Sequence, residues 1–161
     1  MDAYDFENSV GFLVNNTAKS FQKILDMELR KKVGVTIGQW RVVVALVREN
    51  GLTQTEIAEK VGIEGATLVP LIDKMEHEGL LKRKPDLRDR RVNRIYLTSK
   101  ADSLWKSMMA CALNIRRIST KGISENELQD TMQTLRKISG NLAEYLPLDA
   151  VVALQKKTGG D

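Results

Sequence analysis

The sequence predicts a mainly α-helical domain that carries one small β-hairpin. Two observations predict this class: apolar residues recur at helical spacing through most of the chain, and one stretch past the middle alternates with a period of two. Gly turns and Ser/Thr capping residues separate the helical segments. With 161 residues, of which 42% are hydrophobic and 29% charged, the chain is long enough to bury a core within one domain.

Long amphipathic helices are predicted at both ends of the chain. Residues 6–34 carry an apolar stripe at helical spacing that ends near a glycine. Two further long helices are expected over about 99–122, capped by Ser99, and over about 124–146, where Ser124 and Glu127 form a capping box. A short helix is expected over 148–157.

Three shorter helices are predicted between these long ones. The first begins at the capping pair Thr36 and Gln39 and ends at Asn50-Gly51. The second begins at Thr53, with Glu56 three residues later, and ends at Gly62, and the third covers about 66–78. The apolar residues expected to face the core from the first of the three are Trp40, Val43, Val44 and Val47.

The predicted hairpin covers about 81–98 and holds most of the excess positive charge. Residues 92–98 alternate as a strand does, and Pro85-Asp86-Leu87-Arg88-Asp89 has turn-forming chemistry. Seven basic and two acidic residues give this stretch a net charge of +5, although the whole chain carries only +4. Such a concentrated basic patch favours contact with phosphates, and a solvated charged loop is the alternative interpretation.

Several function classes are excluded by composition. The longest apolar runs have six residues, so no membrane span is expected, and the N-terminus lacks the features of a signal peptide. We therefore expect a cytoplasmic protein without membrane partners. Cys111 and His77 are each the only residue of their type, so we expect no disulfide, no metal site and no cofactor. Without a nucleophile and base near a cleft, we expect no enzyme.

Two short helices around a Gly turn, followed at once by a basic hairpin, are the parts of a winged helix-turn-helix. In this module the second helix enters the major groove of DNA and the hairpin, or wing, contacts the backbone and minor groove. The module accounts for residues 36–98. The remaining segments, 1–35 and 99–161, are then expected to bury their apolar stripes against each other and against a second copy, which gives a homodimer within one compact domain.

The whole chain resembles the MarR/SlyA type of winged-helix transcriptional regulator. The resemblance is carried by Asp86-Leu87-Arg88-Asp89-Arg90-Arg91, by Ile95-Tyr96-Leu97-Thr98 and by the helix order over residues 6–146. It implies a dimeric regulator of transcription that binds duplex DNA, and we expect a repressor. It also implies that Asp89 supports Arg91, that Arg91 enters the minor groove, and that Arg88, Arg90 and Arg94 contact the groove or phosphates.

The second helix of the module departs from the pattern of this family. Members usually carry Arg or another polar residue where this chain has Pro70, and residues 64–79 sum to a charge of −3. We therefore expect affinity to come mostly from the wing, and specificity to depend on DNA shape and to favour A·T-rich centres. The residues of the helical part expected to lie against DNA are Gln54, Thr55, Gly65, Ala66, Thr67, Val69 and Pro70. Thr67 could bond to bases or phosphates, and Ala66 or Val69 could touch a thymine methyl.

Two further expectations concern ligands and partners. The family often binds a small aromatic or phenolic effector between the dimer helices and the DNA-binding lobe, and the residues expected near such a place are Asn16, Lys19, Trp40 and Arg41. The alternative function is a winged-helix interaction module that binds a protein partner or structured RNA. Its support is the acidic helix with Pro70, and the salt dependence of binding separates the two functions.

Overall fold

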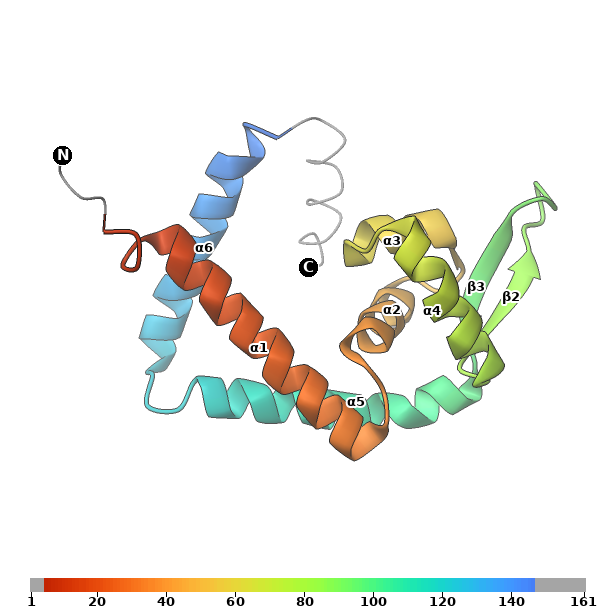
Figure 1. The fold of residues 1–161 in the computed structure, drawn as a ribbon, viewed down its shortest axis with the longest axis horizontal. Helices are drawn as coiled ribbons and strands as arrows, with labels where there is room; N and C mark the ends of the chain where they lie inside the picture. Colours follow the sequence, from red (N-terminus) through yellow and green to blue (C-terminus); the bar gives the residue numbers. More distant parts are fainter. Residues whose placement is uncertain (1–4, 147–161) are drawn as a thin grey trace.

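The computed structural model describes residues 5–146, and in this part of the chain it has six α-helices and one three-stranded antiparallel sheet (Figure 1). The predicted class, mainly α-helical with a β-hairpin, is confirmed. The elements are α1 (Val10–Val33), α2 (Ile37–Arg48), β1 (Leu52–Thr53), α3 (Gln54–Val61), α4 (Gly65–His77), β2 (Leu81–Pro85), β3 (Asn93–Leu97), α5 (Ser99–Ser119) and α6 (Glu125–Ala143). The short helix expected over 148–157 lies outside the described residues.

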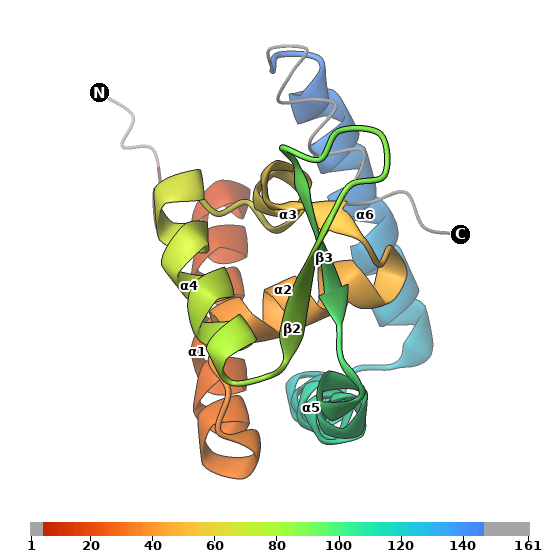
Figure 2. The same cartoon turned by 90° about the vertical axis from the view of Figure 1, so that its right-hand side faces the viewer.

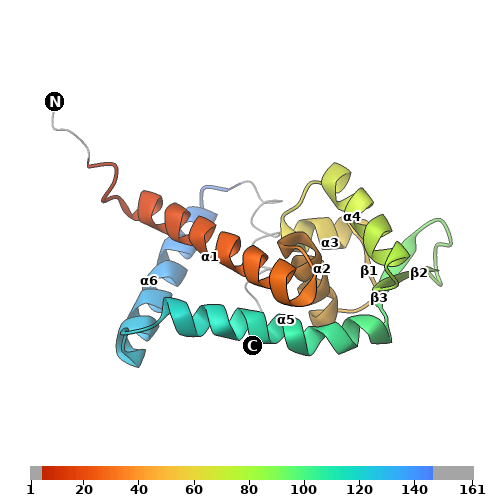
Figure 3. The ribbon, with the colours of Figure 1, turned by 60° about the horizontal axis from the view of Figure 1, so that its bottom comes forward.

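The arrangement separates a small lobe from three long helices. The lobe contains α2, α3, α4 and the sheet, and the β2–β3 hairpin projects from it (Figure 1). Helix α1 crosses α5 and packs against it, while α6 turns away from the end of α5 (Figure 3). Helices α1 and α6 lie on opposite sides of the molecule when it is viewed from the wing (Figure 2).

Helix boundaries follow the capping chemistry with two differences. The capping boxes of α2, α3 and α6 are formed as predicted, by Thr36, Thr53 and Ser124 with their partners three residues later. Helix α1 begins only at Val10, because Ser9 caps it by accepting from the backbone N–H of Phe12 at 3.3 Å.

The second difference lies at the start of α5. Its N-cap is Thr98 rather than Ser99, and no side-chain cap bond forms. The Thr98 hydroxyl donates instead to the Gly79 carbonyl at 2.7 Å, which ties the entry of α5 to the end of α4.

The sheet has the strand order β1-β3-β2. Strands β2 and β3 pair from Leu81↔Leu97 to Pro85↔Asn93, so the hairpin predicted over 81–98 is present. Strand β1 was not predicted because it has only two residues, and its pairing, Leu52↔Ile95, joins positions far apart in the sequence. The turn before β1 requires glycine: Gly51 has φ +87°, and a Cβ there would meet the Tyr96 ring at 2.9 Å.

The core connects the lobe to the long helices. Fully buried side chains come from α1 to α5 and from β1 and β3; they include Leu29, Leu46, Ile72, Ile95 and Met108. Cys111 is also buried there, and burial raises the pKa of its thiol.

The buried face of α2 differs from the prediction. Val43 is buried as expected, but Val47 is 44% exposed. The other buried residues of the helix are Gln39, Val42, Ala45 and Leu46. The run from residue 42 to residue 47 is apolar on every side of the helix, so its periodicity does not say which face is inside.

Candidate nucleic-acid interface

The wing loop is held in shape by Asp86. One oxygen of this carboxylate accepts from the backbone N–H groups of Arg88 at 2.7 Å and Asp89 at 3.1 Å, and the other pairs with Arg94. Together these bonds, that of Arg94 first, lower the pKa of Asp86 from its ordinary 3.8 to about 2. The carboxylate therefore remains ionised, and it fixes the direction in which the loop presents its side chains.

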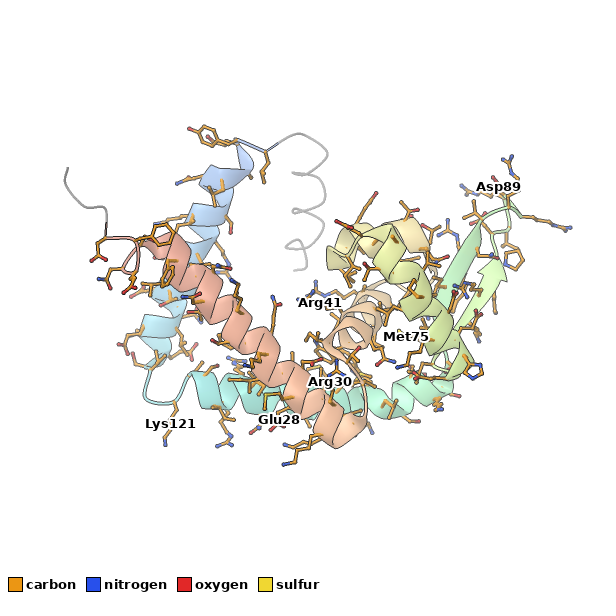
Figure 4. All side chains as sticks on the ribbon, in the orientation of Figure 1. Glu28, Arg30, Arg41, Met75, Asp89 and Lys121 are labelled. Carbon is orange, nitrogen blue, oxygen red and sulfur yellow. The ribbon has the colours of Figure 1, made fainter. Side chains whose placement is uncertain are left out.

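Arg91 stands at the wing tip, bonded to Asp89. Its backbone N–H and its Nε donate to one Asp89 oxygen at 3.0 Å each, and its Nη2 donates to the other at 2.9 Å. These bonds lower the pKa of Asp89. The Arg91 side chain is still 90% exposed, and Asp89 lies at the far end of the hairpin (Figure 4). The Arg91 guanidinium, a planar fork of N–H donors, is thus oriented by one carboxylate and remains accessible to a partner.

The remaining wing cations fall into two groups. Arg94 points back to the base of the wing, where Nη1 donates to the Gly51 carbonyl at 2.8 Å and the guanidinium pairs with Asp86. Lys82, Arg88 and Arg90 are exposed, and none of the ion pairs found among residues 5–146 involves them. This positive charge without an ion-pair partner among the described residues therefore lies on β2, at Lys82, and in the loop between β2 and β3, at Arg88 and Arg90.

Helix α4 lies beside the wing with one face buried and the other open. Leu68, Ile72 and Met75 anchor the buried face (Figure 4, Met75). The open side is formed by Gly65, Ala66, Thr67, Val69, Pro70, Asp73, Lys74 and His77. Pro70 is the sixth residue of this helix rather than a first-turn residue, and the helix continues through it.

An arginine that the sequence analysis did not single out connects α4 to the wing. Arg83 of β2 pairs with Asp73 at 2.5 Å and with the Glu76 carboxylate, which also accepts from the Arg83 backbone N–H at 3.0 Å. One of the two negative charges that Asp73 and Glu76 give α4 is therefore offset by a neighbouring strand. The strand alternation of Lys82, Arg83 and Lys84, which turns only the middle one toward α4, was the signal that could have found it.

The two expected positions on α3 are placed differently. Thr55 is exposed, whereas the side-chain amide nitrogen of Gln54 is buried and has no hydrogen-bond partner among the described residues. Thr55 is therefore the more accessible of the two.

A cavity of about 630 Å³ lies where α1, α2, α5 and α6 approach each other. Trp40 and Arg41 line it, as expected, together with Phe21, Arg116 and Met132. Trp40 stacks on Trp105, with the ring centroids 5.5 Å apart and the planes at 12°. Arg41 extends from α2 toward the side of α1 (Figure 4).

The other two expected effector residues lie apart from that cavity. Asn16 lines a second cavity of about 370 Å³ between α1 and α5, and Lys19 is exposed and lines neither. The structure thus brings together two of the four residues and leaves two outside. Arg116, Phe21 and Met132 were missed because their convergence depends on how the long helices cross.

Two kinds of feature are absent from residues 5–146. The described helices include none that is long and apolar enough to cross a membrane. The same part of the chain has no group of three or more His, Cys, Asp or Glu side chains placed to hold a metal ion.

The helix-turn-helix with its hairpin defines a winged-helix protein. The MarR family model matches residues 35–92, which run from the start of α2 through β2 and the wing loop. The chain is 36% identical to transcriptional regulator PA3341, and the match has a TM-score of 0.74 and covers 84% of this chain and 99% of that one. This chain belongs to the MarR family of transcriptional regulators.

Two more distant solved structures share the fold. One is BpsR of Bordetella bronchiseptica, whose DNA binding is regulated by 6-hydroxynicotinic acid; it is 24% identical, with a TM-score of 0.74 and coverage of 84% of this chain and 96% of that one. The other is CouR of Rhodococcus jostii RHA1 bound to p-coumaroyl-CoA. It is 23% identical, with a TM-score of 0.70, and the match covers 82% of this chain and 92% of that one.

Proposed function

We propose that this transcriptional regulator binds duplex DNA through the wing and α4. The observation that carries the proposal is the exposed Arg91 fork, which Asp89 orients at the tip of a hairpin rich in unpaired cations. A guanidinium held this way suits the negative potential of a narrow minor groove. Arg88 and Arg90 contact neighbouring phosphates, and Arg94 shapes the base of the wing.

The helical part of the lobe is assigned to the major groove. There α4 presents Gly65, Ala66, Thr67, Val69 and Pro70, and Thr55, with Gln54 beside it, lies at the start of α3. Because none of these side chains is cationic, affinity rests on the wing, and specificity leans on A·T-rich DNA whose minor groove is narrow.

We further propose that the DNA-binding form is a homodimer built by the segments 1–35 and 99–161. None of the described residues of α6 is buried, yet the helix carries an apolar stripe. Helix α1 likewise exposes Leu13 at 52% and Phe21 at 42%. A second copy related by a twofold axis covers both faces and pairs two reading lobes, one for each half-site.

The cavity between α1, α2, α5 and α6 is proposed as the effector site. Its aromatic wall, Trp40, and its two guanidinium groups, Arg41 and Arg116, fit a small aromatic anion. The 6-hydroxynicotinic acid that regulates DNA binding by BpsR belongs to this class, and the coumaroyl group of the CouR ligand is also aromatic. Asn16 and Lys19 then take part only if the helices move on dimer formation. We propose further that the regulator represses transcription while it occupies its operator and that the effector releases it from the DNA.

The test is a fluorescence anisotropy titration of wild type and Arg91→Ala against mixed-sequence and A·T-rich duplexes at two salt concentrations. Wild type is expected to bind more weakly at the higher salt, and Arg91→Ala to lose roughly tenfold or more in affinity. Arg117→Ala, which removes an exposed arginine of α5 far from the wing, is the matched control.

Two outcomes would contradict the proposal. Arg91→Ala and Arg117→Ala could bind equally well, which would remove the wing from the interface. Alternatively, wild type could fail to bind either duplex at low salt. The acidic α4 would then favour the second function, a winged-helix module that binds a protein partner or structured RNA.

A further inference from the structure

The outward face of α4 is chemically unusual for a helix in a major groove. Its first two turns present Ala66, Val69 and Pro70 at positions that share one side of the helix, and Val69 is 47% exposed. The next positions along that side are Asp73 and His77. The leading part of the face is therefore apolar, although it is open to solvent.

The two charged groups beside this face, Asp73 and Lys74, are already engaged in ion pairs. Asp73 is bonded to Arg83 at 2.5 Å, and the Lys74 ammonium lies 3.8 Å from the carboxylate of Glu78, the C-cap residue of α4. The first two turns hold no Arg or Lys for guanine and no Asn or Gln for adenine. A bidentate hydrogen-bonded contact to a purine is therefore not available from this part of α4.

We propose that α4 reads C5-methyl groups of pyrimidines in the major groove, with Val69 as the main contact and Ala66 and Pro70 beside it. The C5-methyl of thymine is the apolar group that a base pair exposes in that groove, so an apolar face there selects it. This inference rests on the proposed DNA binding. It adds a direct reading of thymine to the shape preference that the wing supplies.

Electrostatics supports the same occupant. Arg83 pairs with both Asp73 and Glu76 and offsets one of their two negative charges, which lowers the repulsion between α4 and the duplex, and the unpaired wing cations hold the helix there. The apolar face therefore lies on the same helix as the two carboxylates that Arg83 of the wing pairs with. An occupant that combines phosphates with exposed methyl groups satisfies both surfaces at once.

The test removes single methyl groups from DNA. A preferred duplex is first selected from a random pool with the full-length protein, and each thymine is then replaced by deoxyuridine, which lacks only the methyl. We expect roughly fourfold weaker binding for each thymine that faces α4, as the loss of one buried methyl predicts. Replacement elsewhere, including under the wing, is expected to leave the affinity unchanged.

Protein variants assign the effect to α4. Val69→Ala is expected to bring the thymine-to-uracil affinity ratio close to one at a contacted position. The matched control is Val47→Ala, the same truncation on α2 at a residue of similar exposure, 44%, and it should keep the ratio. Val69 is exposed, so its truncation leaves the core intact.

A second arm separates thymine from methylated cytosine. Cytosine and 5-methylcytosine are compared at the same positions. Tighter binding of 5-methylcytosine assigns the contact to the methyl group in either base pair, and a methyl effect with thymine alone assigns it to thymine. Equal affinity of thymine and uracil at every position, in a duplex that wild type still binds, would overturn the inference. Failure to bind any duplex would instead overturn the proposed function.

Discussion

The side-chain amide of Gln39 donates to a carboxylate oxygen of Glu78 at 2.8 Å and so joins the first turn of α2 to the end of α4. Gln39 is only 2% exposed, and its amide oxygen accepts from the backbone N–H of Thr36 at 2.8 Å. One buried side chain therefore closes a capping box and also holds the end of α4, the helix proposed to enter the major groove. Trp40 and Arg41, the next residues of α2, line the cavity proposed for the effector.

Gln39→Ala is expected to lower the free energy of unfolding by about 1–3 kcal/mol, because it leaves buried polar partners without hydrogen bonds. Urea denaturation followed by circular dichroism measures this loss. The control is Gln133→Ala, which removes an exposed glutamine of α6 and should change the free energy by less than about 0.5 kcal/mol. Equal effects of the two variants would show that the bond to Glu78 contributes nothing.

Arg83→Met tests the neutralisation of α4. The methionine keeps an apolar stem but removes the charge that compensates Asp73 and Glu76, so those carboxylates repel the phosphates. We expect DNA affinity to fall roughly tenfold at low salt, with a loss of about 1 kcal/mol in stability. The combination with Asp73→Asn and Glu76→Gln should recover most of the affinity. If the triple variant binds as weakly as Arg83→Met, Arg83 contacts DNA itself.

Arg91 and Arg83 show which contacts of the site could be predicted from the sequence and which could not. The capping pairs fixed the helix starts because cap and helix lie within a few residues of each other, and the period-two pattern located the hairpin. The partner of each wing arginine depends on which way its strand turns it and on what is packed there. Asp89 could be paired with Arg91 through the family resemblance, whereas Asp73 lies ten residues from Arg83 on another element. The full set of residues that line the cavity could not be predicted from the sequence, because helices that are distant in sequence meet there.

Asp86 gives the wing a defined response to acid. Its pKa in the folded protein, about 2, lies below the ordinary 3.8, chiefly because of Arg94 and then of the backbone N–H groups of Arg88 and Asp89. The stabilisation by its carboxylate is therefore fully present above about pH 4 and is lost as the pH falls from about 4 to about 2. Asp86→Asn should be less stable than wild type at pH 7, and the difference should shrink over that window.

Urea midpoints of wild type and Asp86→Asn at several pH values measure this difference, and a carbon-detected NMR titration of the Asp86 carboxyl measures the pKa directly. A carboxyl that titrates near its ordinary value would contradict the geometry of the wing loop. A difference between the two proteins that stays constant from pH 7 to pH 2 would assign the effect to packing instead of charge.

The exposed apolar stripe of α6 predicts that two copies of the chain form a dimer. Leu135, 40% exposed, lies on the stripe, and Gln133 lies on the opposite side of the same helix. Light scattering after gel filtration is expected to give twice the chain mass of 18.1 kDa for wild type. Leu135→Glu should raise the dimer dissociation constant at least about tenfold, because it places a charge in an apolar interface. Gln133→Glu adds the same charge and should leave the dimer intact. A monomeric wild type would remove the proposed twofold arrangement.

The effector site can be monitored without a label, because the chain has only two tryptophans and they stack on each other beside the cavity. Titration with 4-hydroxybenzoate, a phenolic carboxylate, is expected to change the intrinsic fluorescence in a saturable way, since a ligand in the cavity contacts Trp40. Arg41→Ala should weaken this binding about tenfold or more through loss of a charge-assisted hydrogen bond. Arg48→Ala, at the exposed end of the same helix, should bind like wild type.

If Arg41→Ala and Arg48→Ala give the same dissociation constant as wild type, the ligand does not bind beside Arg41. If wild type shows no saturable change while Trp40 remains stacked, the cavity does not accept this class of anion, and the release of DNA must have another trigger.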